Sequence, residues 1–148
     1  MRPVLSYGAE TWTTTRAEDR ELQIFERKVL RRIFGPVCIA GEWRRRTNNE
    51  LYALYNEPDV VWLNKLARLR WAGHVVRMNE DAVPKKVLMD PLYGRRRVGR
   101  PRLRWLDCVG NDDRYIGIRN WMGAAQNRDS WRLLLEEAKT RQRVVELR

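Results

Sequence analysis

The chain has 148 residues, which is enough for one domain with a modest hydrophobic core. Hydrophobic residues make up 43% of the sequence, a proportion that excludes a wholly disordered chain. The formal net charge of +11 at pH 7 makes a polyanion the leading partner, with nucleic acid ahead of an anionic membrane surface.

Cysteine and histidine are too few for a disulfide framework or a zinc site. The sequence has two widely separated cysteines, one histidine and no Cys-x-x-Cys motif. We therefore predict no metal or other cofactor, and a reducing compartment, nuclear or cytoplasmic. No run of the roughly 18–20 apolar residues that cross a membrane occurs, so we expect no membrane partner.

The N-terminal part of the chain predicts an entry segment followed by a helix. Residues 1–14 are expected to enter from an upstream domain, with one short strand possible at residues 4–7. The Thr15–Glu18 capping box then predicts a helix start. Apolar residues recur at helical spacing from Leu22 to Ile33, and Gly35-Pro36 predicts the helix end.

Two further helices are predicted before the centre of the chain. Residues 36–46 are expected to form a loop, and a second capping box at Thr47–Glu50 predicts a short helix that Pro58 terminates. A longer helix is predicted over residues 59–78, because apolar residues from Trp62 to Val76 follow a single packing seam.

The whole pattern predicts an all-α fold, a small irregular helical bundle in which the apolar seams pack together. We divide it into a helical region at residues 15–89, a basic loop rich in Gly, Pro and Arg at 90–101, and C-terminal helices at 102–148. The last helix is expected to begin between residues 127 and 130.

Most of the excess positive charge lies in the central third of the chain. Residues 59–106 hold twelve Lys or Arg against four Asp or Glu, and residues 94–104 alone hold six Arg. Guanidinium groups match phosphate oxygens in a bidentate fork, and a neighbouring indole can stack on a base or sugar. The predicted nucleic-acid contacts of this loop are Arg95, Arg96, Arg97, Arg100, Arg102, Arg104 and Trp105. The alternatives are a solvated loop or a nuclear-localisation signal.

The predicted helix before this loop supplies a second set of candidate contacts: Arg68, Arg70, His74 and Arg77. We interpret Trp71 between them as a packing residue. His74 is expected either to donate to phosphate or to pack, and a lone histidine is not a catalytic base without a partner.

The Asp112-Asp113 pair resembles the adjacent carboxylates of polymerase palms, which hold two metal ions. Palm aspartates lie between apolar strand residues, whereas this pair follows Gly110-Asn111. We therefore interpret it as a solvated turn or a helix cap. The sequence also shows no nucleophile with a neighbouring base, so we predict no catalysis by this chain.

Five separated blocks of the sequence resemble the region just after the reverse-transcriptase domain of non-LTR (LINE-type) retrotransposons. The blocks are residues 7–12, 25–35, 69–78, 99–107 and 128–132. They occur in order over nearly the whole chain. The resemblance implies a C-terminal, thumb-adjacent fragment of an endonuclease–reverse transcriptase polyprotein, without the palm and its catalytic aspartates.

The expected partners are therefore RNA or DNA, contacted through phosphates, and the upstream reverse-transcriptase domain of the parent polyprotein. Two alternatives stay open on the sequence alone. The chain is either a protein-interaction module whose arginines only solubilise it, or a transposon remnant without a selected role.

Overall fold

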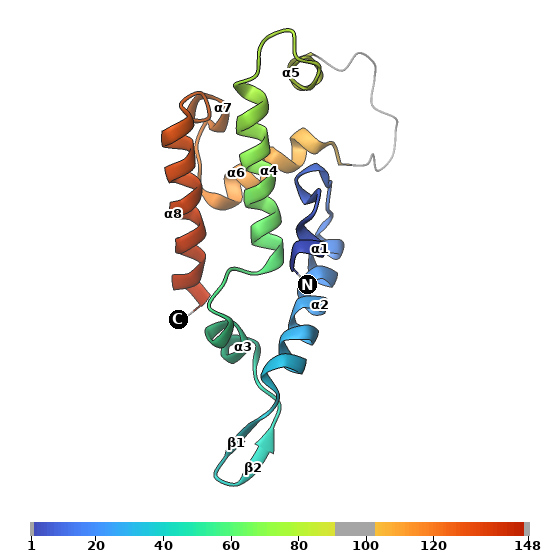
Figure 1. The fold of residues 1–148 in the computed structure, drawn as a ribbon, viewed down its shortest axis with the longest axis vertical. Coiled ribbons are helices and arrows are strands. Elements are labelled where there is room, and N and C mark those ends of the chain that lie inside the picture. Colours follow the sequence, from blue (N-terminus) through green and yellow to red (C-terminus); the bar gives the residue numbers. More distant parts are fainter. Residues whose placement is uncertain (1, 91–102, 147–148) are drawn as a thin grey trace.

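The computed structural model describes residues 2–90 and 103–146 and shows a mostly helical fold with one small two-stranded sheet (Figure 1). The all-α prediction is confirmed in its main feature. The elements in chain order are α1 (Arg2–Ser6), the 3-10 helix η1 (Ala9–Thr11), α2 (Arg16–Phe34), β1 (Val37–Ile39), β2 (Glu42–Arg44), α3 (Asn48–Tyr55), α4 (Val60–Val76), α5 (Val83–Met89), α6 (Trp105–Ile116), α7 (Trp121–Ala124) and α8 (Arg128–Glu146).

Local sequence signals fix the starts of the N-terminal helices. Both predicted capping boxes are present, with Thr15 and Glu18 at the start of α2 and Thr47 and Glu50 at the start of α3. Gly35 ends α2 at a φ of 65°, a value that L side chains rarely adopt. These boundaries follow from contacts between residues close in sequence.

Helix α4 is the central element of the fold. It contacts η1, α6, α8, α2, α1, α5 and α7, and Figure 1 shows it running between α8 on one side and α1 and α2 on the other. Its buried residues form one core with the apolar faces of α6, α7 and α8. This core includes Leu66, Leu69, Ala72, Val76, Val109, Ile116, Trp121, Trp131 and Leu135.

A close approach in this core joins α4 to α8. Trp131 is 2% exposed and lies directly against Gly73. A β-carbon added to Gly73 would lie 2.2 Å from Nε1 of the Trp131 indole, well inside van der Waals contact. The absence of a side chain at residue 73 therefore allows a large aromatic ring to fill the space between the two helices.

The local structure differs from the sequence analysis in three places. Residues 4–7, for which the sequence left a short strand or an entry segment open, belong to or follow α1. The expected loop at 36–46 contains an antiparallel hairpin, in which Cys38 pairs with Trp43. The short helix α7 was not predicted, because a stretch of four residues carries too little periodicity to be distinguished from a turn.

The expected apolar stripe of α2 enters the core only in part. Phe25 is 43% exposed and Ile33 is 68% exposed, whereas Glu26 and Leu30 are buried. Glu26 is accommodated because its Oε2 accepts hydrogen bonds from the Val60 backbone N–H (3.0 Å) and the Tyr52 hydroxyl (3.2 Å). A buried carboxylate therefore joins α2 to α3 and α4, and much of the apolar face is left at the surface.

Within the described residues, no helix is both long enough and apolar enough to cross a membrane.

The Gly73–Trp131 contact predicts how two glycine substitutions will differ. Gly73→Ala should lower the free energy of unfolding by about 1–3 kcal/mol, because the new methyl group overlaps the indole. Gly110→Ala in α6 is the control, since its β-carbon would meet no atom within 4 Å. This second variant should gain up to about 1 kcal/mol from helix propensity. Urea unfolding of the two variants and the wild type measures both changes, and equal stabilities would contradict the close approach.

Candidate nucleic-acid interface

A groove between α4 and α8 gathers cationic side chains from both helices. Its volume is about 720 Å³. The lining residues are Arg70, His74, Arg77, Arg128, Asp129, Trp131, Arg132 and Leu135. Buried Trp131 and Leu135 contribute an apolar floor, and the charged groups come from the exposed edges of the two helices.

The α4 wall of the groove carries three of the residues that the sequence predicted. Arg70, His74 and Arg77 are separated by four and three residues, so they share one face of the helix. The Arg70 side chain is 69% exposed and lies 3.6 Å from Glu136, a distance and exposure typical of a weak surface ion pair. The His74 ring lies 5.3 Å from the Trp71 ring.

Arg77 is held more firmly than the other two. Its Nη1 donates a 2.6 Å hydrogen bond to the backbone carbonyl of Ala125, which follows α7. Burial lowers the pKa of Arg77, and the nearby charge of Arg128 lowers it further. Two guanidinium groups from different helices are therefore close enough to repel each other at one end of the groove.

The α8 wall is the part that sequence reasoning missed. Arg128 and Arg132 are four residues apart on an exposed helix face, so both point from α8 into the same groove. Asp129 is the acidic residue among the described side chains that line the groove, and it lies 4.0 Å from Arg132. The four-residue spacing of Arg128 and Arg132 is visible in the sequence, but only the fold shows that their side chains face α4.

The structure corrects the expectation that Arg68 contacts nucleic acid. Its side chain is 2% exposed, and Nη1 lies 2.8 Å from Oδ2 of Asp112. Nη2 donates a 3.4 Å hydrogen bond to the Thr14 hydroxyl. A guanidinium that is buried with a carboxylate partner is not available to phosphate, so Arg68 joins α4 to α6 instead.

The sequence predicts that Asp112 is part of a solvated turn or a helix cap. The structure shows that this interpretation is wrong for Asp112. It lies within α6 and is 3% exposed. Burial raises the pKa of Asp112 to about 6, although the positive charge of Arg68 opposes the shift. The 2.8 Å contact with Nη1 of Arg68 gives this buried carboxyl group a charged partner.

Two aromatic residues also differ from expectation. Trp105 was expected to stack on a base or sugar, but its Nε1 donates a 2.7 Å hydrogen bond to the Glu10 carbonyl and its ring packs against the core. Trp71 was interpreted as a packing residue, yet it is 36% exposed beside His74. The core side of α4 is already filled by smaller residues such as Leu69 and Ala72, so the Trp71 ring remains near the surface.

The basic loop lies largely outside the described residues. Arg95, Arg96, Arg97, Arg100 and Arg102 fall within residues 91–102, so their contacts stay predictions from the sequence. Arg104 is described and exposed, and its backbone N–H donates to Asp107 at the start of α6. In the described ranges, no cluster of three His, Cys, Asp or Glu side chains is arranged to hold a metal ion.

Comparison with known proteins gives one similarity. The chain is 26% identical over 146 residues to an uncharacterised transposon-derived protein of Caenorhabditis elegans, which covers 93% of this chain. The chain spans about half the length of that relative, at 52%. No protein-family model and no solved structure matches the chain.

The burial of Arg68 predicts that this residue contributes to the stability of the fold, whereas Arg70 in the groove does not. Arg68→Gln should lower the free energy of unfolding by about 3–5 kcal/mol, because it leaves Asp112 buried without its charged partner. Arg70→Gln, at an exposed site, should change it by less than about 0.5 kcal/mol. The double variant Arg68→Met/Asp112→Leu should regain most of the loss in urea unfolding. A single Arg68→Gln variant as stable as the wild type would contradict this role.

Proposed function

We propose that this chain binds nucleic acid through phosphate contacts in the groove between α4 and α8. The observation that carries the proposal is the convergence of Arg70, Arg77, Arg128 and Arg132 from two helices on one surface. The guanidinium forks of arginine suit phosphate oxygens, and a row of such groups attracts a polyanion. The arginines of the basic loop are included in the proposal on the basis of their sequence alone.

The length of the groove suits a short stretch of the sugar–phosphate backbone of a nucleic acid. The seven helical steps from Arg70 to Arg77 span about 10 Å along the axis of α4. About three phosphates of one B-form strand occupy the same axial length. Because the contacts reach phosphates and the groove walls carry long, flexible side chains, we expect binding without strong sequence preference.

We infer a transposon origin for the chain from its similarity to the transposon-derived protein of Caenorhabditis elegans. More specifically, we propose a C-terminal fragment of a LINE-type reverse transcriptase that has no catalysis of its own. Two of the five resembling blocks, residues 69–78 and 128–132, form the facing walls of the groove. Their juxtaposition supports a common binding role for these blocks in the parent polyprotein.

The salt dependence of binding tests this function. Affinity for a labelled oligonucleotide should fall steeply as salt rises, with a log–log slope of about 0.9 per phosphate contact on duplex DNA. The double variant Arg70→Gln/Arg132→Gln should weaken binding and reduce this slope by about one for each arginine. Fluorescence anisotropy at several salt concentrations measures both quantities.

The matched control removes the same charge elsewhere. Arg20 and Arg114 are exposed residues of α2 and α6 and do not line the α4–α8 groove. Arg20→Gln/Arg114→Gln should leave the slope nearly unchanged. Equal losses in the two double variants would show that only net charge matters, and absence of binding by the wild type at low salt would refute the proposed function.

A second candidate function rests on a different observation, an apolar groove between α1 and α2. It has a volume of about 870 Å³, and its apolar lining includes Leu5, Trp12, Ala17, Leu22 and Phe25. The 43% exposure of Phe25 is unusual for a large aromatic side chain. We propose that the reverse-transcriptase domain of the parent polyprotein docks here.

Co-purification with a separately expressed reverse-transcriptase domain tests this docking. Association should survive nuclease and high salt, because apolar contacts are not screened. Phe25→Ser should weaken it, whereas Leu133→Ser, at an exposed apolar residue of α8, should leave it unchanged. Loss of the complex on nuclease treatment would mean that nucleic acid bridges the two proteins, and would contradict direct docking.

A further inference from the structure

The hairpin of β1 and β2 projects from the helical body at one end of the molecule (Figure 1). Ala40 and Gly41 connect its strands, and both have positive φ, at 52° and 88°. Positive φ at both central residues is the geometry of a type I′ turn, which matches the twist of paired strands. The hairpin is therefore a regular, tightly closed element.

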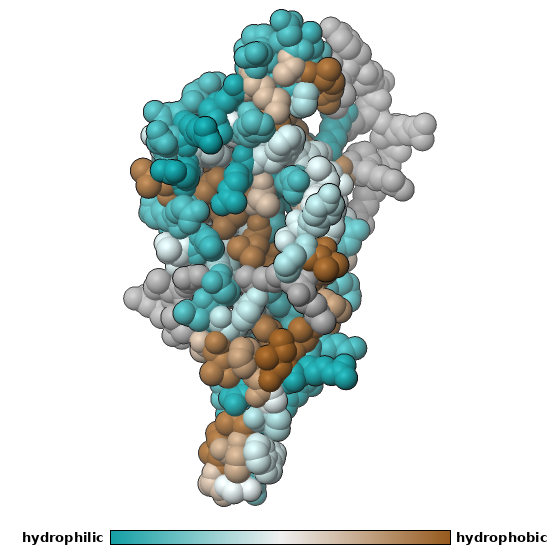
Figure 2. Space-filling view, viewed as in Figure 1, coloured by the Kyte–Doolittle hydropathy of each residue, from teal (hydrophilic) through white to brown (hydrophobic). Residues whose placement is uncertain are grey.

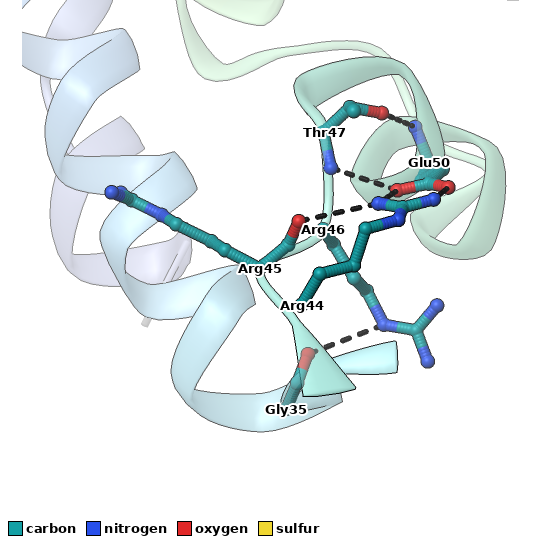
Figure 3. A network of polar contacts seen from close by, with 6 residues as sticks. All are labelled: Gly35, Arg44, Arg45, Arg46, Thr47 and Glu50. Carbon is teal, nitrogen blue, oxygen red and sulfur yellow. Dashed lines mark hydrogen bonds and ion pairs between the residues drawn. The ribbon is translucent and has the colours of Figure 1, made fainter. Parts of the chain in front are cut away.

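Polar contacts brace the base of the hairpin against the helices (Figure 3). The Arg44 guanidinium binds both carboxylate oxygens of Glu50, at 2.5 and 3.0 Å, and it also donates to the Arg45 carbonyl. This pairing is the main reason that the pKa of Glu50 falls to about 2. Arg46 Nε donates to the Gly35 carbonyl at the end of α2. Two of the three consecutive arginines thus hold the hairpin in place.

The braced hairpin presents a tryptophan to the surface. Trp43 is 72% exposed, although tryptophan is usually among the more buried residues. It pairs with Cys38 across the hairpin, so both lie on the face opposite Arg44. Figure 2 shows hydrophobic residues around this end of the molecule, while the region of α7 and the start of α8 is mostly hydrophilic on the same view.

Basic residues are concentrated in the segment of the chain that contains this tryptophan. Residues 27–46 hold seven Lys or Arg and one acidic residue, Glu42. In Figure 3 the Arg45 side chain extends toward α2, away from Arg44 and Glu50. Arg31 in the last turn of α2 donates to Asn48 through Nη2, and its buried Nε has no hydrogen-bond partner among the described residues. Burial and the charges of Arg45 and Arg27 lower the pKa of Arg31, as expected for neighbouring cations.

We propose that this hairpin is a second binding surface, specific for single-stranded nucleic acid, in which Trp43 stacks on an unpaired base and Arg31 and Arg45 bind flanking phosphates. An exposed indole on a braced hairpin suits stacking, because the backbone that carries it is held in place by Arg44 and Arg46 before the base arrives. A base within a duplex is stacked on its neighbours and offers no free face. The surface is separate from the α4–α8 groove, so it does not depend on the function proposed for that groove.

Three labelled probes test the proposal with the full chain: a blunt DNA duplex, the same duplex with a thymidine tail, and the single-stranded tail sequence. Trp43→Ala should weaken binding of the tailed duplex and the single strand by about tenfold, and leave the blunt duplex unchanged. Trp43→Phe, which keeps an aromatic face, should recover most of the affinity. Arg45→Gln should reduce the salt slope for the single strand by about 0.7.

Other outcomes overturn the proposal or separate it from the groove function. If Trp43→Ala binds the single strand as tightly as the wild type does, the proposal is overturned, and the hairpin is then expected to contact a protein. If Trp43→Ala loses as much affinity for the blunt duplex as for the single strand, the proposal is also overturned. A loss in Trp43→Ala without any effect of Arg70→Gln/Arg132→Gln supports the hairpin and refutes the groove.

Photocrosslinking of the wild type avoids any dependence on variant folding. With 5-iodouracil in the single-stranded probe, the crosslinked peptide should contain Trp43, and crosslinks found only elsewhere overturn the proposal.

Discussion

The contact between Gly73 and Trp131 is the constraint on which the rest of the C-terminal half depends. The indole fills the space that a side chain at residue 73 would occupy, so α4 and α8 approach each other closely. Their apolar faces then form the core with α6 and α7, while their adjacent edges form the charged groove. The same packing that stabilises the bundle therefore brings arginines from distant segments of the chain to one surface.

The arginines fall into two groups that net charge alone does not distinguish. Some have protein partners: Arg68 is paired with Asp112 in the interior, and Arg44 is paired with Glu50 at the base of the hairpin. Others, such as Arg70 and Arg132, lie at the surface with distant or weak ion pairs. The net positive charge of the sequence therefore overstates the number of guanidinium groups that a phosphate can reach, because burial decides which of these groups are available.

The two proposed binding surfaces differ in chemistry as well as in place. The α4–α8 groove offers guanidinium groups above an apolar floor, which suits phosphates. The hairpin offers an exposed indole within a basic segment of the chain, which suits an unpaired base with its backbone. Together they would suit a nucleic acid that passes from duplex to single strand.

The sequence by itself determined the elements whose signals are local. The capping boxes at Thr15 and Thr47, the glycine at residue 35 and the long apolar seam of α4 all specify helices through contacts within a few residues. Tertiary structure alone decided that Arg68 and Asp112 are buried together, that Trp71 stays near the surface and that Arg128 faces α4. A charged residue can be buried only when a partner from another element neutralises it, and that partner is known only once the helices are packed.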